Sequence, residues 1–373
     1  MLYWLFVEPG PMADIMPGTN VFRYISFRTA WGMITALMVS YLVFPGFIRW
    51  MKQRKVDQII RSDGPESHLL NKVGTPTMGG VPILAGVAIA TRLWSRVDLP
   101  ATWMVLIVML GYGAIGFYDD WKKVMEKSAA GLAGRMKLFF QILIGGGVLA
   151  YGYVMNVYPV DLSFPFIADY AIDFSELWVG APDAFGWAYV ALALFVVVGA
   201  SNAVNLTDGL DGLAIGPVMT SAATYGLIAY LTGHVAFSEY LDIPYVAGTG
   251  ELTVIAFTLV GAGLGFLWYN AYPASIFMGD VGSLALGGTL AMLAVLSKHE
   301  VLLAIVGGIF VLETLSVIIQ VTSFKLTGKR VFAMAPIHHH YEKLGWSEPK
   351  IIVRFWIISV VLALVALSTL KLR

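Results

Sequence analysis

The sequence predicts an all-α polytopic membrane protein, with about ten transmembrane helices in a single integral domain over residues 1–373. Two observations carry this prediction: the composition, and the alternation of apolar runs with polar breaks. Of the 373 residues, 58% are hydrophobic and 13% are charged, whereas roughly 25% are charged in a typical globular protein. The zero formal net charge gives no indication of a nucleic-acid partner, and the absence of cysteine excludes disulfides and thiolate metal sites.

Each transmembrane helix needs about 20 mainly apolar residues to cross the bilayer core. Only Lys298, His299 and Glu300 separate the eighth candidate run from the ninth, so we expect these two helices to form a tight hairpin. The N-terminal residues lack a basic segment followed by a small-residue cleavage site, which argues against a removable signal peptide. The ten apolar runs extend over residues 26–48, 78–95, 101–118, 136–155, 186–202, 213–232, 251–268, 283–297, 301–324 and 351–370.

The basic residues predict the orientation of the chain. Three segments between the runs, residues 49–77, 119–137 and 324–354, contain 17 of the 24 lysine and arginine residues. Because cytoplasmic loops retain positive charge, we expect these segments to face the cytoplasm and both termini to lie outside. The sequence has no repeat of fixed period.

The first polar cluster follows the third run. Asp119 and Asp120 are adjacent there and are followed by Lys122 and Lys123. Two neighbouring carboxylates at a membrane boundary need nearby cations to stay ionised, and either a divalent metal or the lysines could supply them. A solvated acidic helix end is an equally good interpretation of this pair alone.

The second cluster lies in residues 202–213, where Asn205, Asp208 and Asp211 accompany two glycines that indicate a turn. If a helix has begun, the two carboxylates three residues apart share one face. The full calcium-loop pattern is absent, and a plain loop is the alternative. The glycosylation sequon at Asn205 is discounted, because the charge distribution places it inside.

The third cluster is residues 277–283, in which glycines flank Asp280 and allow a close approach of backbone and ligand. A lone acid at a membrane boundary is a candidate ligand or ion site. Lys72 belongs to a further segment, residues 71–80, whose hydroxyls and glycines suit phosphate binding. A topological role or contact with anionic lipid is the alternative for that lysine.

The fourth cluster contains three of the six histidines, His338, His339 and His340. Consecutive residues point in different directions on a helix, which argues against a three-histidine zinc site. Contact with a phosphate or a nucleotide is favoured, and a solvated loop is the alternative. Glu313 lies inside the ninth run, where a buried interhelical hydrogen bond is favoured over a role in shaping a groove for a lipid tail.

Taken together, these clusters predict phosphoryl transfer at a membrane interface. Acids can hold a divalent cation, whereas lysines and histidines can bind phosphates, and the protein then mainly positions groups and offsets charge. Oxygen ligands favour Mg²⁺, with Mn²⁺ as the alternative, over zinc.

In their order along the chain, the four clusters resemble the phospho-N-acetylmuramoyl-pentapeptide transferase family, within the polyprenyl-phosphate N-acetylhexosamine-1-phosphate transferase superfamily. The resemblance covers nearly the whole chain. It implies an enzyme of the bacterial inner membrane that transfers phospho-MurNAc-pentapeptide from UDP-MurNAc-pentapeptide to undecaprenyl phosphate. The products would be UMP and lipid I, for peptidoglycan synthesis, and a homodimer is also implied.

The resemblance also implies roles for individual residues. Asp280 would bind Mg²⁺, and Asp119 and Asp120 would serve the lipid phosphate and the reacting diphosphate. Arg135 stands near the place where a basic residue is expected after the aspartate pair, without an assigned role. The nucleotide-sugar pocket would include Asn205, Asp208, Asp211, Asn270 and Phe277, with Lys72, Lys127, His338, His339 and His340 near the phosphates or the nucleoside.

Two other functions fit part of the sequence. A transferase that uses UDP-GlcNAc and the same lipid shares most of these motifs, although the histidine triplet favours the muramoyl enzymes. A secondary transporter would also combine intramembrane acids with helices broken at glycine. Transporters place their sites near the bilayer midplane, however, whereas four of the five polar segments described above lie in or beside loops.

Overall fold

A computed structural model describes residues 1–7, 19–54, 74–128, 130–166, 171–174 and 182–371. Lys72 lies outside these residues. The described helices and strands are α1 (Leu2–Phe6), η1 (Thr19–Arg23), α2 (Ile25–Gln53), α4 (Gly80–Trp94), α5 (Pro100–Glu126), α6 (Gly134–Val154), β1 (Asp161–Ser163), β2 (Ala171–Asp173), α7 (Pro182–Thr207), α8 (Ile215–Thr232), α9 (Val235–Leu241), η2 (Thr249–Glu251), α10 (Leu252–Asn270), α11 (Gly279–Leu296), α12 (Leu303–Val306), α13 (Gly308–Thr327), α14 (Ile337–Lys343), α15 (Glu348–Ser368) and η3 (Thr369–Lys371).

The prediction of an all-α polytopic membrane protein is confirmed. Nine of the ten apolar runs each lie on one helix, and the ninth run along the chain is divided between α12 and α13. The one small sheet in the described chain is an antiparallel pair of strands, β1 and β2. Eight helices of the described chain are long and apolar enough to cross a membrane. Helix α4, with 15 residues, and α8 are not among these eight, so the count of ten crossings stays a prediction.

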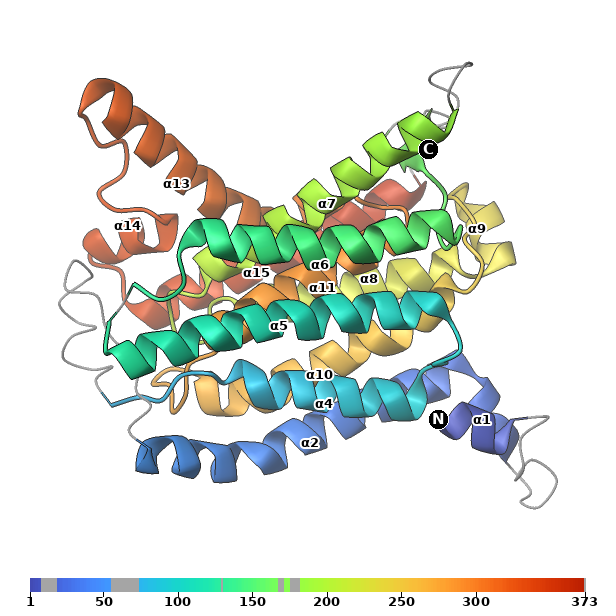
Figure 1. The fold of residues 1–373 in the computed structure, drawn as a ribbon, viewed down its shortest axis with the longest axis horizontal. Coiled ribbons are helices and arrows are strands. Elements are labelled where there is room, and N and C mark those ends of the chain that lie inside the picture. The colour runs from blue at the N-terminus through green and yellow to red at the C-terminus, as the bar shows by residue number, and fades with distance from the viewer. Residues whose placement is uncertain (8–18, 55–73, 129, 167–170, 175–181, 372–373) are drawn as a thin grey trace.

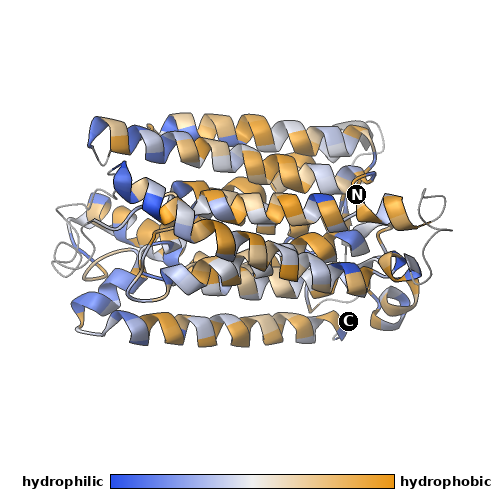
Figure 2. Cartoon of the chain, turned by 90° about the horizontal axis from the view of Figure 1, so that it is seen from below, coloured by the Kyte–Doolittle hydropathy of each residue, from blue (hydrophilic) through white to orange (hydrophobic). Residues whose placement is uncertain are grey.

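Helices α10 and α11 form the centre of the bundle. Both are apolar on all sides, as expected for helices surrounded by protein. Helix α10 packs against α2, α4 and α8, whereas α11 packs against α5 and α7 (Figure 1). The outer helices expose large apolar side chains, such as Phe195 of α7 and Leu42 of α2, which are 74% and 66% exposed. Figure 2 shows hydrophobic residues along the middle of the outer helices, as expected where lipid surrounds the bundle.

Different helix ends lie together at the two ends of the bundle. The short helix α1 and the C-terminal end of α15 lie at one end, and α14 lies with the C-terminal end of α5 at the other (Figure 1). Helix α5 continues to Glu126, so Asp119 and Asp120 lie within the helix and not beyond its end. The last turn is supported by an ion pair between Lys122 and Glu126, with nitrogen and oxygen 3.9 Å apart.

The predicted hairpin of the eighth and ninth runs is wrong. The connection after α11 is short, but it contains α12, and the chain breaks again at Gly307 before α13 begins. Helix α13 then leans away from α11 and packs against α7, α14 and α15 (Figure 1). An uninterrupted apolar sequence therefore contained a helix break, because the glycine pair 307–308 permits a change of direction.

Candidate active site

Two glycines allow the helices of the first and third clusters to meet. A Cβ atom on Gly116 of α5 would lie 2.1 Å from the carbonyl oxygen of Asp280. Gly279, at the start of α11, has a φ of +71°, and a Cβ atom there would lie 2.3 Å from a carboxylate oxygen of Asp120. Because no side chain separates the two backbones, the aspartates near the end of α5 face the first turn of α11.

Three carboxylates gather at this contact. Asp119, Asp120 and Asp280 each offer an oxygen, and these oxygens all lie within 4.8 Å of one another. Asp119 also accepts a hydrogen bond from the backbone N–H of Leu132, at 2.6 Å, and Asp120 accepts one from the N–H of Val281, at 3.3 Å. The second bond places Asp120 at the N-terminus of α11, where free N–H groups favour a negative charge.

Two lysines hold the three carboxylates together. The Lys123 ammonium lies 2.5 Å from Asp119 and 3.4 Å from both Asp120 and Asp280. The Lys137 ammonium, on α6, lies 3.0 Å from Asp119 and 2.5 Å from Asp280. We call these five residues the acidic centre. Three carboxylates against two ammonium groups leave one formal negative charge, so the centre attracts a further cation.

The sequence did not single out Lys137. The family resemblance implied Lys127 near the phosphates and gave Arg135 no role. Both are exposed, at the C-terminal end of α5 and in the first turn of α6. Lys127 is the left-handed residue that ends α5. The available signal was helical spacing, because residues four apart share one face of a helix and Lys137 is four positions before Gln141, a polar residue within an apolar run.

The acidic centre offers the ligands that a hard divalent cation prefers. Its acceptors are carboxylate oxygens, and the described residues contain no second cluster of three or more acids and histidines with comparable spacing. Oxygen ligands suit Mg²⁺ or Mn²⁺ better than zinc. Asp119 and Asp120 are nearly buried, while the lysines and Asp280 retain side-chain exposures of 14–27%, so a small ion or a phosphate can approach from that side.

Backbone pairing brings the segment after Lys72 to the same place. The N–H of Phe277 donates to the carbonyl of Pro76 at 2.9 Å, and the N–H of Gly79 donates to the carbonyl of Phe277 at 2.8 Å. Residues 76–80 and 277–278 therefore run side by side at the start of α4 and α11. The prediction that these two segments share a site with the aspartates is consistent with this pairing.

The second cluster forms a neighbouring loop, and two of its residues hold the backbone. Asp211 accepts a hydrogen bond from the N–H of Ala274 at 2.9 Å. Asn270 accepts one from the N–H of Gly212 and donates one to the carbonyl of Ile276, both at 2.8 Å. These two side chains join the loop after α7 to the loop before α11, so each has a structural contact that the sequence did not predict.

The other predicted residues of this pocket keep more accessible surface. Asn205 accepts a hydrogen bond from the hydroxyl of Ser283 at 2.8 Å, which connects α7 with α11 beside the acidic centre. Asp208 and Phe277 are partly buried. The loops of the second and third clusters thus lie on adjoining helices, next to the carboxylates.

The histidines point in three directions, as predicted. His338 is buried, and its Nδ1 lies 3.1 Å from Glu313, which confirms the buried hydrogen bond expected for that acid. His339 pairs with Glu342 at 2.5 Å, and His340 accepts a hydrogen bond from the N–H of Ala333 at 3.1 Å. The imidazole of His338 lies against Gly209, so α14 covers the loop that contains Asp208.

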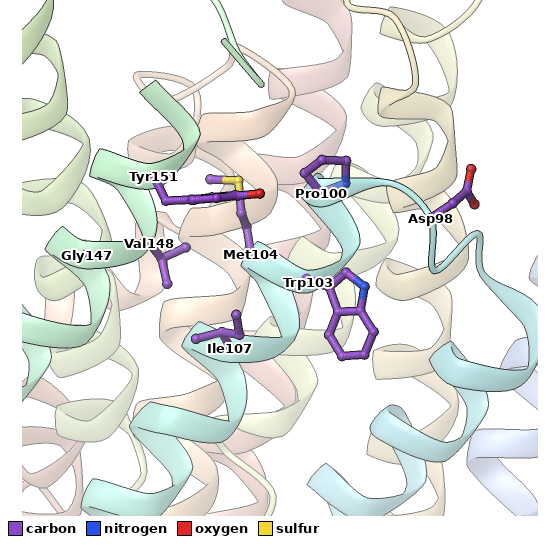
Figure 3. Close-up of a pocket in the computed structure, with 8 residues that line it drawn as sticks. All are labelled: Asp98, Pro100, Trp103, Met104, Ile107, Gly147, Val148 and Tyr151. Atoms are coloured by element: carbon purple, nitrogen blue, oxygen red, sulfur yellow. The ribbon is translucent and has the colours of Figure 1, made fainter. Parts of the chain in front are cut away.

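A separate groove lies far from these residues. It has a volume of about 460 Å³ and opens between the first turns of α5 and the second half of α6 (Figure 3). The acidic centre is at the other end of α5, so the groove plays no part in it. The lining residues are Asp98, Pro100, Trp103, Met104, Ile107, Gly147, Val148 and Tyr151.

Comparisons with known proteins show which family the chain resembles. A family model described as Glycosyl transferase family 4 matches residues 102–298, a stretch that includes the three aspartates and both lysines of the acidic centre. A protein of Pelobacter propionicus, named phospho-N-acetylmuramoyl-pentapeptide-transferase, is 54% identical over 373 residues, and the match covers 100% of both chains. The likeness therefore extends beyond the acidic centre to the histidines of α14.

Proposed function

The chain belongs to the phospho-N-acetylmuramoyl-pentapeptide transferase family, and from this premise we propose its reaction. It transfers phospho-MurNAc-pentapeptide from UDP-MurNAc-pentapeptide to undecaprenyl phosphate and releases UMP. The observation that carries the proposal is the acidic centre, in which three carboxylates and two ammonium groups meet at one end of a membrane bundle.

The reaction exchanges one phosphoanhydride bond for another. An oxygen of the lipid phosphate attacks the β-phosphorus of the nucleotide, and the bond from that phosphorus to the oxygen of UMP breaks. The second pKa of a phosphate monoester is about 6, so the lipid phosphate is largely a dianion at neutral pH and needs little activation. Direct attack is therefore favoured over a covalent aspartyl intermediate, which is the rival route.

The residues of the acidic centre have different proposed roles. Asp119 positions the acceptor phosphate or takes its remaining proton, while Lys123 and Lys137 offset the charge of the phosphates that enter. Asp120 and Asp280 hold a divalent cation, which we propose to be Mg²⁺. When bound, that cation would neutralise charge on the diphosphate.

The nucleotide-sugar pocket is proposed to lie between the loops after α7 and before α11. Asn205, Asp208 and Phe277 line it, and Asp211 and Asn270 maintain its walls through their backbone hydrogen bonds. His338, His339 and His340 approach from α14, and Lys72 and Lys127 are proposed near the phosphates.

The acidic centre is proposed to face the cytoplasm, where the soluble nucleotide is available. The basic segments 49–77, 119–137 and 324–354 are adjacent in sequence to the helix ends at this side of the bundle, and the positive-inside rule supports this orientation. The membrane is proposed to be the bacterial inner membrane, as the family implies. The homodimer implied by the family stays a prediction.

The test is UMP release by the purified protein with UDP-MurNAc-pentapeptide, undecaprenyl phosphate and Mg²⁺. We expect turnover with this donor and little with UDP-GlcNAc. Turnover with UDP-GlcNAc alone would instead support the related N-acetylglucosamine transferase. Release without any lipid acceptor would contradict transfer to the lipid.

A further inference from the structure

A buried layer of polar side chains lies about one helical turn below the acidic centre. Gln141 is on α6, one turn after Lys137, and is 0% exposed. Its Nε2 donates to the hydroxyl of Ser201 at 2.9 Å, and its Oε1 accepts a hydrogen bond from the Nδ2 of Asn202 at 3.0 Å. The amide therefore uses both of its ends to hold α6 against α7.

The layer extends to the other two helices of the centre. The hydroxyl of Ser201 donates to the carbonyl of Leu284 at 2.9 Å, one turn after Asp280 on α11. The hydroxyl of Tyr112, two turns before Asp119 on α5, donates to the backbone carbonyl of Gln141 at 2.9 Å. Gln141 thus connects to both other helices that contribute to the acidic centre, by its backbone carbonyl to α5 and by its side chain through Ser201 to α11.

The hydrogen bonds run in one direction, and each polar side chain of the layer has at least one partner. Asn202 donates to Gln141, Gln141 to Ser201, and Ser201 to the α11 backbone. In an apolar bundle an unpaired amide or hydroxyl is costly, so α6 has one rotation and one height at which all these bonds are made. A helix shift of one residue would break the whole set.

This layer matters because Lys137 bridges two other helices. Its ammonium contacts Asp119 of α5 and Asp280 of α11, and a long lysine side chain alone fixes its end poorly, since each rotatable bond adds freedom. A displacement of about 1 Å in a catalytic group can lower the rate by about 100-fold.

We propose that Gln141 is a positioning residue of the transferase: its side-chain hydrogen bonds with Ser201 and Asn202, beside the bond from Tyr112 to its backbone carbonyl, fix α6 so that Lys137 stays between Asp119 and Asp280. This proposal rests on the proposed function, because it requires Lys137 to act on the reacting phosphates. Gln141 itself is buried and touches no substrate.

The test is a double-mutant cycle in steady-state UMP release, with Gln141→Met, Lys137→Met and both together. We expect Gln141→Met to lower kcat by about 10- to 100-fold with little change in KM for the nucleotide, since the positioned group acts on the transition state. Because Gln141 works through Lys137, the double variant should be no slower than Lys137→Met alone.

Thr253→Val is the matched control. Thr253 is also buried and also makes one hydrogen bond between helices, to the carbonyl of Gly226 at 2.9 Å, far from the acidic centre. Thr253→Val should lower thermal stability by about as much as Gln141→Met does, while leaving kcat unchanged. If Gln141→Met fails to fold, Ser201→Ala removes the same link with a smaller change in volume, and the same non-additivity is expected with Lys137→Met.

Two results would overturn the proposal. One is full kcat in Gln141→Met, or in Ser201→Ala, and the other is a double variant whose loss equals the product of the two single losses. UMP release by the unsubstituted protein reports on the proposed function separately. An active parent with additive variants would therefore reject the role of Gln141 and keep the transferase.

Discussion

A cluster of charged residues lies at each end of α11, and the two clusters differ in how far their side chains are exposed to solvent. At the N-terminal end, the acidic centre combines three acids with two lysines that keep 17–27% of their side-chain surface exposed. Beyond the C-terminal end, Lys298 is 0% exposed and contacts Glu300 at 3.1 Å and the hydroxyl of Tyr189 at 2.7 Å. Glu300 also accepts a hydrogen bond from Tyr189.

The comparison separates a reactive cluster from a structural one. Lys298 and Glu300 are paired within the protein and closed to solvent, so they join the turn after α11 to α7. The acidic centre crowds like charges, keeps a formal negative charge and stays partly open. Crowded charges at an accessible position are typical of functional sites, whereas sealed pairs are usually structural.

The largest expected effect on kcat comes from a substitution in the acidic centre, at the N-terminal end of α11. Asp280→Asn removes one of three carboxylates while keeping the size of the side chain. We expect kcat to fall by about 100- to 1,000-fold at saturating Mg²⁺, since the loss of one preorganised electrostatic group costs about that much, with thermal stability close to that of the parent. Near-normal turnover in both Asp280→Asn and Asp119→Asn would reject the assignment of the acidic centre.

The cluster of Lys298, Glu300 and Tyr189 beyond the C-terminal end of α11, which we call the sealed end, should show the opposite pattern. Lys298→Met leaves the Glu300 carboxylate buried without its cation, and breaking a buried pair costs about 3–5 kcal/mol. Thermal unfolding in detergent should show the loss, while the folded fraction keeps its kcat. Lys298→Met with Glu300→Gln should recover part of the stability. A stable Lys298→Met variant with a large loss of kcat would break the comparison.

A third pair, Glu313 and His338, tests whether a buried pair can also affect the reaction. Glu313 and His338 are both buried, like the sealed end, but α14 lies beside the proposed pocket. Glu313→Leu leaves the imidazole without its partner, at a cost of about 1–3 kcal/mol. We expect KM for the nucleotide to rise by about tenfold with a smaller change in kcat. Loss of stability alone would place this pair with the sealed end.

The smallest effect concerns pH. Burial raises the pKa of Glu300 above its ordinary value of 4.5, although Lys298 and Tyr189 oppose the change. The folded protein then binds this proton more tightly than the unfolded chain. The resulting stability is fully present below about pH 4.5 and is lost as the pH rises through the folded pKa.

Glu300→Gln removes this titration, so its stability relative to the parent should rise with pH from about 4.5 towards 7. Thermal unfolding across that range measures the difference. Glu239→Gln, at an exposed carboxylate of α9, is the matched control and should follow the parent. A flat difference for Glu300→Gln would show that the carboxyl titrates alike in the folded and unfolded chain.

The sequence predicted the acids better than their partners. Asp119, Asp120 and Asp280 were identifiable because an acid is rare beside long apolar runs. Lys137 was not, because its contact with Asp280 joins residues 143 positions apart and depends on the rotation of α6. The same limit applies to Gln141, whose role follows from which helices lie next to it.

Two other differences have local causes. Asp211 and Asn270 were predicted as pocket residues, but their hydrogen bonds go to the backbone of a loop that only folding brings near. The hairpin of the eighth and ninth runs was wrong because α13 turns away after Gly307 to pack on other helices. Hydropathy identifies a helix well, but the direction of that helix is set by its neighbours.

Binding of Mn²⁺ by the purified protein, followed by electron paramagnetic resonance, tests the central claim most directly because it needs no turnover. We expect the parent and Lys298→Met to bind one ion alike, and Asp280→Asn combined with Asp120→Asn to lose that ion. Equal binding by all three proteins would contradict a cation site in the acidic centre.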